Sequence, residues 1–152
     1  MTKKILVTGA LGQIGSELVF ELRKKYGNEN IIASDLKDKN LVDKSFYPYE
    51  KIDVLNKQQL SLVIKKYEIN IIYHLAAILS AAGEKNPQLC FDVNIVGLYN
   101  VLEAARELNV KQIICPSSIA VFGPKTSKEK TPQETIILPK TMYGVSKVAG
   151  EL

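Results

Sequence analysis

The chain has 152 residues, of which 46% are hydrophobic and 24% charged, and its formal net charge is +4 at pH 7. These are ordinary values for a globular protein, and the length is sufficient for one domain with a sizeable core. The lysines are scattered along the chain, and no zinc-finger or RNA-binding motif is present, so we infer no nucleic-acid partner.

The first element is a short apolar strand around residues 3–6 that leads into a turn containing Gly9, Gly12 and Gly15. The turn opens a helix predicted over residues 12–26. This order is typical of a phosphate-binding turn, in which Gly9 permits the tight bend and Gly12 lets the backbone approach a pyrophosphate. Gly15 would let the helix pack close to the strand, and the helix N-terminus would face the phosphates. Three glycines alone also fit an ordinary turn between a strand and a helix.

Asp35 makes the nucleotide-binding interpretation stronger. It follows the second apolar run, residues 31–34, at about 20 residues beyond the turn. A carboxylate at this place accepts hydrogen bonds from the ribose hydroxyls of adenosine and repels a 2′-phosphate. We therefore expect NAD rather than NADP, although Lys37 lies nearby.

The middle of the chain alternates between short strands and helices. Residues 36–50 are polar and irregular, and a third strand is predicted to end at residues 52–54. Asn56 is the expected N-cap of a helix over residues 57–67, and a fourth strand is predicted over residues 71–75. A loop containing Gly83, Asn86 and Pro87 follows.

The second half is expected to begin with a long helix over residues 88–108, closed by Asn109. Its apolar side is predicted to consist of Leu89, Val93, Val96, Val101, Leu102 and Ala105. A fifth strand is predicted over residues 112–115, followed by a loop over residues 116–140. A last helix should begin at Thr141 or Met142.

Strands that alternate with helices indicate a parallel sheet with helices on both faces, in which ligands bind at the carboxyl ends of the strands. We therefore predict an α/β, doubly wound, Rossmann-type domain over residues 1–152. The residues expected at strand ends carry suitable chemistry: the glycine turn, Asp35, Asp53, residues 75–77 and the pair Ser117 and Ser118.

Tyr143 and Lys147 lie one helical turn apart, so they share a face of the last predicted helix. A tyrosine phenol is a poor base at neutral pH, but a nearby ammonium group stabilises the phenolate and makes proton abstraction feasible. Ser118, or its neighbour Ser117, can bind the oxygen that is oxidised. Such a pair is also common on ordinary helices, so it is informative only beside a nucleotide-binding half.

Cys90 and Cys115 are the only cysteines, and the chain has one histidine, His74. Neither cysteine has the spacing of a metal ligand, so we expect no metal site and two buried, unreactive thiols. His74 is expected to be a hydrogen-bonded strand-end residue. No apolar run approaches the roughly 18 residues of a membrane span, and no signal peptide is apparent. We expect a cytoplasmic protein with no membrane partner.

Together these motifs resemble the extended short-chain dehydrogenase/reductase superfamily. Within it, residues 79–87, 116–124 and 139–147 are similar to the short-chain type of L-threonine 3-dehydrogenase. The resemblance implies oxidation of L-threonine by NAD, with Tyr143 as general base, Lys147 assisting it and holding the nicotinamide ribose, and Ser118 binding the substrate hydroxyl. The implied substrate-binding residues are Ser80, Ser118 and Tyr143.

The resemblance also implies a set of residues that bind NAD. Asp53 would contact the adenine amino group, and Val54 its ring. Asn94 fits this role and, equally, that of a polar helix residue bonded to backbone. The cofactor-binding set is Gly9, Gly12, Gln13, Ile14, Gly15, Asp35, Leu36, Asp53, Val54, Leu75, Ala76, Ala77, Asn94, Tyr143 and Lys147.

Members of the resembled family continue beyond this point into a smaller C-terminal substrate domain. We therefore expect the chain to be the N-terminal portion of a longer protein, and a homodimer in the complete protein. Two alternatives stay open: a nucleotide-sugar epimerase or dehydratase, which uses the same Ser, Tyr and Lys, and a non-catalytic NAD-binding fragment.

Overall fold

The computed structural model describes residues 3–152. The chain divides into two compact units. Unit 1 consists of the chain up to Ala76 together with Gly97–Pro116, and unit 2 consists of Ala77–Val96 and Ser117–Leu152. The expectation of one nucleotide-binding domain over residues 1–152 stays a prediction.

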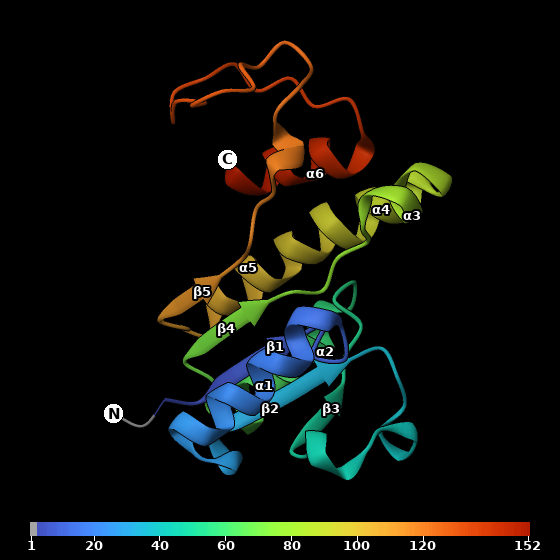
Figure 1. Ribbon diagram of the computed structural model, residues 1–152. Helices are drawn as coiled ribbons and strands as arrows, with labels where there is room; N and C mark the ends of the chain where they lie inside the picture. Colours follow the sequence, from blue (N-terminus) through green and yellow to red (C-terminus); the bar gives the residue numbers. More distant parts are fainter. Residues whose placement is uncertain (1–2) are drawn as a thin grey trace. The chain divides into compact units, whose positions relative to one another are not determined.

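Unit 1 contains a parallel five-stranded sheet in the order β3-β2-β1-β4-β5 (Figure 1). In chain order the strands are Ile5–Thr8 (β1), Ile31–Asp35 (β2), Tyr49–Lys51 (β3), Ile71–His74 (β4) and Gln112–Ile114 (β5). The central strand β1 ends at Thr8, which lies opposite Ser34 of β2 and His74 of β4. The strand order reverses direction between β1 and β4, and this is the point at which doubly wound sheets bind ligands.

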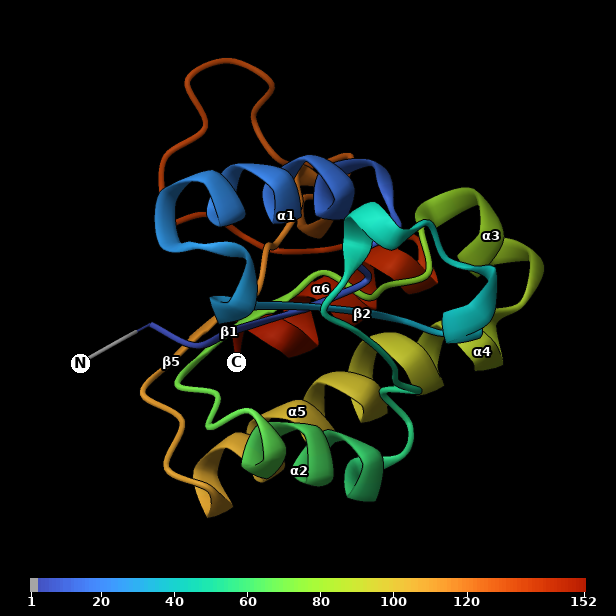
Figure 2. The ribbon, with the colours of Figure 1, turned by 90° about the horizontal axis from the view of Figure 1, so that it is seen from below.

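Helices cover both faces of this sheet, as predicted (Figure 2). Helix α1 (Gln13–Tyr26) covers one face, and α2 (Lys57–Lys66) and α5 (Gly97–Glu107) cover the other. Successive strand residues point to opposite faces of the sheet, so the apolar strands contribute side chains to two hydrophobic cores. Ile5, Val7 and Ile31 belong to the core that includes Val19 and Leu22 of α1. The second core joins alternate strand residues to α2 and α5: Leu6, Ile32, Ile72, Leu60, Val63, Val101 and Ala104.

The predicted position of the third strand was wrong. The strand is Tyr49–Lys51, which pairs with Ala33–Asp35 at the end of β2 and therefore has no partner beyond Lys51. Ile52 still donates its N–H to the carbonyl of Asp35 at 2.9 Å. Ile52 and Val54 are buried although neither lies in a strand. Their apolar side chains therefore indicated burial and not strand structure.

Unit 2 is helical. It contains α3 (Ser80–Lys85), α4 (Pro87–Phe91), α6 (Met142–Glu151) and a short 3-10 turn at Ile119–Val121. The loop predicted around Gly83 is therefore wrong for Ser80–Lys85, which form α3. A Cβ at Gly83 would lie 2.9 Å from Cys90 Sγ, so this glycine marks close packing between α3 and α4 rather than a loop.

The long helix predicted over residues 88–108 is present but interrupted. A π-helical turn, Asp92–Val96, joins α4 to α5. The expected inward positions Leu89, Val96 and Leu102 are exposed by 40%, 37% and 45%, whereas Val101 and Ala105 are buried as predicted. A π turn has more residues than an α turn, so a period of 3.6 counted through it assigns the wrong face.

The predicted N-cap Asn56 and the predicted start of the last helix are confirmed. Asn56 accepts a hydrogen bond from Gln59 N at the start of α2, and Thr141 accepts one from Gly144 N at the start of α6. Cys90 is buried as expected, but Cys115 is exposed, because it follows the end of β5 at the edge of the sheet. Within residues 3–152, no helix combines the length and apolar character needed to cross a membrane.

Candidate active site

The glycine turn between β1 and α1 is shaped by close backbone contacts. Gly9 has a φ of +68°, and a Cβ there would lie 2.7 Å from the backbone nitrogen of Ala76. A Cβ on Gly15 would lie 2.2 Å from the carbonyl oxygen of Gly9. A Cβ on Gly12, in contrast, would meet only that same oxygen, at 3.3 Å. The fold therefore demands glycine at Gly9 and Gly15, whereas Gly12 leaves space above the turn.

The N-terminus of α1 suits an anion. Its N-cap is Gly12, which makes no side-chain cap hydrogen bond, and Gln13 and Ile14 in the first turn are exposed. The first N–H groups of a helix lack intrahelical acceptors and carry partial positive charge. Helix N-termini of this kind are suited to binding phosphate groups.

Asp35 is held at the end of β2 by both its side chain and its main chain. Its carboxylate accepts hydrogen bonds from Leu11 N at 3.1 Å and Leu36 N at 2.8 Å. Its carbonyl accepts the Tyr49 hydroxyl at 3.2 Å, and the same hydroxyl donates to Lys37 O at 2.7 Å. A carboxylate has lone pairs beyond these two bonds, so Asp35 can still receive the ribose hydroxyls.

Tyr49 was not recognised in the sequence as part of this site, because it lies in the stretch that we predicted to be irregular. Its side chain is fully buried, and burial raises its pKa to about 12. It therefore remains a neutral hydrogen-bond donor over the whole physiological range.

The loop after β3 is fixed from two helices. Gln59 of α2 accepts a hydrogen bond from Asp53 N at 3.0 Å, and Asp53 Oδ1 accepts one from Leu55 N at 2.9 Å. Asn100 of α5 donates through Nδ2 to Val54 O at 3.0 Å and to Leu55 O at 3.1 Å. The sequence analysis missed Gln59 and Asn100. Their only signal in the sequence was that each is a polar residue on a predicted helix.

The end of β4 lies against the glycine turn within unit 1. His74 is buried, and its Nδ1 lies 2.8 Å from Thr8 Oγ1, which agrees with the expected role of a hydrogen-bonded strand-end residue. Leu75 N donates to Thr8 O at 3.1 Å, and Ala76 N lies 3.4 Å from Thr8 Oγ1. Leu75 and Ala76 are thereby held against the glycine turn.

In unit 2, Tyr143 and Lys147 share one face of α6, as predicted. The Nζ of Lys147 lies 5.6 Å from the centre of the Tyr143 ring. Both side chains are half-buried. This cation–π contact places the ammonium group of Lys147 beside the Tyr143 ring.

Ser118 lies in the segment that packs against α6. Its Oγ accepts a hydrogen bond from Ala120 N at 3.2 Å and caps the 3-10 turn. A Cβ on Gly144 would lie 2.4 Å from Ala120 O, so the turn and α6 are in close contact. The neighbouring Ser117 instead donates its hydroxyl to Glu151 at the far end of α6.

Asn94 lies in the π turn, and its amide is engaged within unit 2. Its Oδ1 accepts from Ile78 N at 2.8 Å, and its Nδ2 donates to Ile78 O and Ser146 Oγ, each at 3.0 Å. Of the two roles predicted for Asn94, these bonds match the backbone-bonding one. Ser80 is exposed as the first residue of α3, and Ala77 lies just before Ile78.

The fold and these residues define a class of protein. Unit 1 has a glycine turn that opens a helix, a carboxylate at the end of β2 and a fixed 53–55 loop, which is the arrangement of dinucleotide-binding folds, and unit 2 carries Ser118, Tyr143 and Lys147. Residues 5–152 match the NAD dependent epimerase/dehydratase family, and the chain belongs to that family. Its cofactor is NAD, and the residues of unit 1 fit the adenosine and pyrophosphate parts of that molecule.

Comparison with known proteins agrees with this assignment. An uncharacterized epimerase/dehydratase of Staphylococcus saprophyticus is 48% identical over 99% of this chain and 47% of its own length. The chain therefore spans about half the length of the curated relatives it matches.

Solved structures of similar proteins lead to the same family. A monomeric L-threonine 3-dehydrogenase from a metagenome, in its apo form, is 57% identical with a TM-score of 0.89, over 97% of this chain and 46% of that one. A GalE-like L-threonine dehydrogenase from Cupriavidus necator, in its holo form, is 44% identical with a TM-score of 0.93, over 97% and 48%. A UDP-glucose 4-epimerase from Thermus thermophilus, in complex with NAD, is 28% identical with a TM-score of 0.79, over 97% and 48%.

Proposed function

We propose that the complete protein containing this chain oxidises L-threonine at its 3-hydroxyl with NAD, giving 2-amino-3-oxobutanoate, NADH and a proton. The observation that carries the proposal is the arrangement on α6, where Lys147 Nζ lies 5.6 Å from the ring of Tyr143 and the turn capped by Ser118 packs against the same helix. The threonine substrate rests on the names of the similar solved proteins, at 57% and 44% identity.

In this proposal Tyr143 removes the proton of the substrate hydroxyl as general base. The ammonium group of Lys147 would stabilise the phenolate form of Tyr143 that accepts this proton, and it would hold the nicotinamide ribose. Ser118 donates a hydrogen bond to the reacting oxygen, and Ser80 lies near the substrate. When bound, NAD supplies the acceptor for the hydride of the carbon that bears the hydroxyl.

The cofactor would be held mainly by unit 1. The glycine turn, with Gln13 and Ile14, would receive the pyrophosphate, and Asp35 with Leu36 the adenosine ribose. Asp53 and Val54 would contact the adenine, and Leu75 and Ala76 would line the end of β4. In unit 2, Ala77 and Asn94 complete the proposed set.

A second candidate is an epimerase or dehydratase that acts on a nucleotide sugar. It uses the same Ser, Tyr and Lys but holds NAD tightly and releases no free NADH. The similarity to a UDP-glucose 4-epimerase supports this second candidate. A third candidate is an NAD-binding chain without turnover.

The deciding experiment measures NADH formation from NAD and L-threonine by the complete gene product and by the 152-residue chain. We expect threonine-dependent NADH with the complete product, and loss of most of that rate in Tyr143→Phe with NAD affinity retained. If the wild-type product binds NAD, ignores threonine and converts a UDP-sugar, the epimerase function replaces our proposal. If the wild-type product binds NAD but turns over neither threonine nor a UDP-sugar, it is a binder only, and unchanged threonine oxidation in Tyr143→Phe would show that Tyr143 is not the base.

We also propose that the complete protein forms a homodimer in the cytoplasm. Tyr99 and Leu102 are exposed on α5, by 60% and 45%, and Val145 is exposed by 44% on α6. Exposed apolar helix faces are typical of subunit interfaces. The similar metagenome enzyme is described as monomeric, so oligomeric state requires its own measurement.

A further inference from the structure

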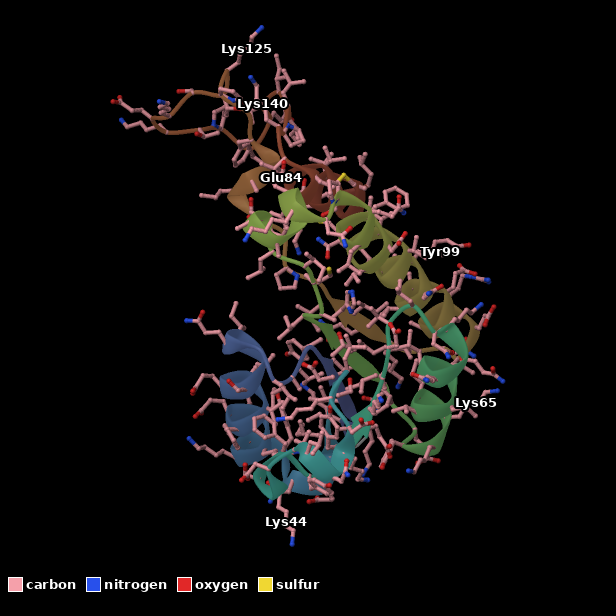
Figure 3. The ribbon with its side chains drawn as sticks, turned by 90° about the vertical axis from the view of Figure 1, so that its right-hand side faces the viewer. Lys44, Lys65, Glu84, Tyr99, Lys125 and Lys140 are labelled. Atoms are coloured by element: carbon pink, nitrogen blue, oxygen red, sulfur yellow. The ribbon has the colours of Figure 1, made fainter. Side chains whose placement is uncertain are left out.

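Helix α3 contacts the start of the helix that carries Tyr143. Glu84 of α3 accepts a hydrogen bond through Oε1 from the backbone N–H of Met142, at 2.7 Å. Met142 is the first residue of α6 and directly precedes Tyr143. Figure 3 labels Glu84 on α3 beside α6, and both helices belong to unit 2.

A second contact joins the same two helices. A Cβ placed on Gly83 would lie 3.9 Å from the Cβ of Tyr143, and it would meet Cys90 Sγ at 2.9 Å. The backbone of α3 at Gly83 therefore packs close to the Cβ of Tyr143. The same short helix begins at Ser80, the residue proposed to lie near the substrate.

These contacts fix the first turn of α6 at two of its backbone donors. The N–H groups of a first turn have no acceptors within the helix, so they are free to bind outside groups. Glu84 takes the N–H of Met142, and Thr141 Oγ1 takes the N–H of Gly144 at 3.0 Å. Tyr143 lies between them. A carboxylate is the stronger of these two acceptors, because it is charged and the N-terminus of a helix carries partial positive charge.

We propose that Glu84 is a positioning residue for Tyr143. It acts through the backbone of Met142 and through the seating of α3 against α6, and it does not touch the reacting atoms. The inference rests on the proposed function, in which Tyr143 is the base. Proton transfer needs the base within hydrogen-bond reach of the substrate, and a displacement of about 1 Å can cost ~100-fold in rate.

The test compares Glu84→Ala and Glu84→Gln in the complete gene product. The glutamine keeps an oxygen that can accept the Met142 N–H, whereas alanine removes the acceptor. Glu134→Gln is the matched control, since it removes one exposed negative charge elsewhere in unit 2. Four quantities are measured: kcat for L-threonine, KM for L-threonine, the dissociation constant of NAD, and the hydrogen-exchange rate of the Met142 amide.

We expect Glu84→Ala to lower kcat about ten- to a hundredfold. KM for threonine and NAD affinity should change by less than about threefold, and exchange at Met142 should become about tenfold faster. Glu84→Gln should restore most of kcat and of the protection at Met142, and Glu134→Gln should match the wild type. A purely structural role for Glu84 would lower thermal stability without separating kcat from KM.

Two outcomes overturn the inference. The first is wild-type kcat and wild-type Met142 exchange in Glu84→Ala. The second is an equal loss of kcat in Glu84→Gln and Glu84→Ala, which would mean that the charge matters rather than the anchored N–H. If the wild-type protein ignores threonine but converts a nucleotide sugar, the proposed function fails, and the same variants are then compared on the sugar.

Discussion

At the scale of single residues, the site depends on side chains that hold the main chain around the candidate ligand-binding groups. Tyr49 is the clearest case in unit 1. Its buried hydroxyl donates to the carbonyls of Asp35 and Lys37, on both sides of Leu36. Tyr49 therefore holds the backbone of residues 35–37, the segment that would bind the adenosine ribose.

Removing this hydroxyl should destabilise the protein measurably. Tyr49→Phe removes this donor from the part-buried carbonyl of Lys37 and leaves that of Asp35 with the N–H of Ile52, so we expect the free energy of unfolding to fall by about 1–3 kcal/mol. Urea unfolding of the two proteins at neutral pH measures this difference. Tyr47→Phe is the matched control, since Tyr47 also donates to a backbone carbonyl, Lys39 O, but is 37% exposed. We expect the control to lose less than about 1 kcal/mol, and equal losses would contradict the argument.

The same residue predicts a pH dependence. Burial raises the pKa of Tyr49 to about 12 in the folded state, above the ordinary value of 10.0. The folded state thus favours the neutral phenol, and the contribution is fully present below pH 10 and is lost as the pH rises towards 12. Tyr49→Phe should flatten the stability profile in this range, and an unchanged profile would show that Tyr49 does not titrate there.

At the scale of elements, the βα turn combines two different demands for glycine. Gly15 is required by the fold, since its Cβ would lie 2.2 Å from Gly9 O. A Cβ on Gly12 would lie 3.3 Å from the same oxygen, so a small shift would let the fold accept a methyl group at this position. The motif in the sequence gives no way to separate these roles, because each position shows only a glycine.

Alanine at each position separates the two demands. Gly15→Ala should lower the free energy of unfolding by more than about 2 kcal/mol and abolish NAD binding, because the turn must move. Gly12→Ala should retain the fold to within about 1 kcal/mol yet weaken NAD binding at least tenfold, because the methyl group lies where the pyrophosphate approaches. Thermal unfolding without NAD and calorimetric titration with NAD measure the two effects. Wild-type NAD affinity in Gly12→Ala would exclude a pyrophosphate at this turn.

The long helix shows what an element-level pattern can miss. The sequence predicted its extent over residues 88–108 but assigned Leu89, Val96 and Leu102 to the inner face, where the structure leaves them exposed. The π turn at Asp92–Val96 changes the angular spacing and brings the polar Asn94 inward. Its cause is tertiary, since Asn94 bonds the backbone of Ile78 and the hydroxyl of Ser146.

At the scale of the whole molecule, the exposed apolar residues predict association. We expect the complete protein to sediment as a dimer, and Leu102→Glu on α5 to yield a monomer that still binds NAD. A charge in an apolar interface is costly because it must be desolvated. Lys65→Glu, an exposed position on α2, serves as the control and should stay dimeric (Figure 3). A monomeric wild type would place this protein with the monomeric metagenome enzyme instead.

The sequence by itself determined the parallel sheet, the glycine turn between β1 and α1, and the placement of Tyr143 and Lys147 on one face of α6. Each of these depends on local order: the alternation of strands with helices, glycines at fixed spacing and the rise of one helical turn. Only the tertiary structure decided where β3 ends, which face of the long helix is buried, and that Tyr49, Asn100 and Glu84 hold the backbone of the site. These features arise from hydrogen bonds between segments far apart in the chain, such as Glu84 with Met142, and no local pattern encodes such partners.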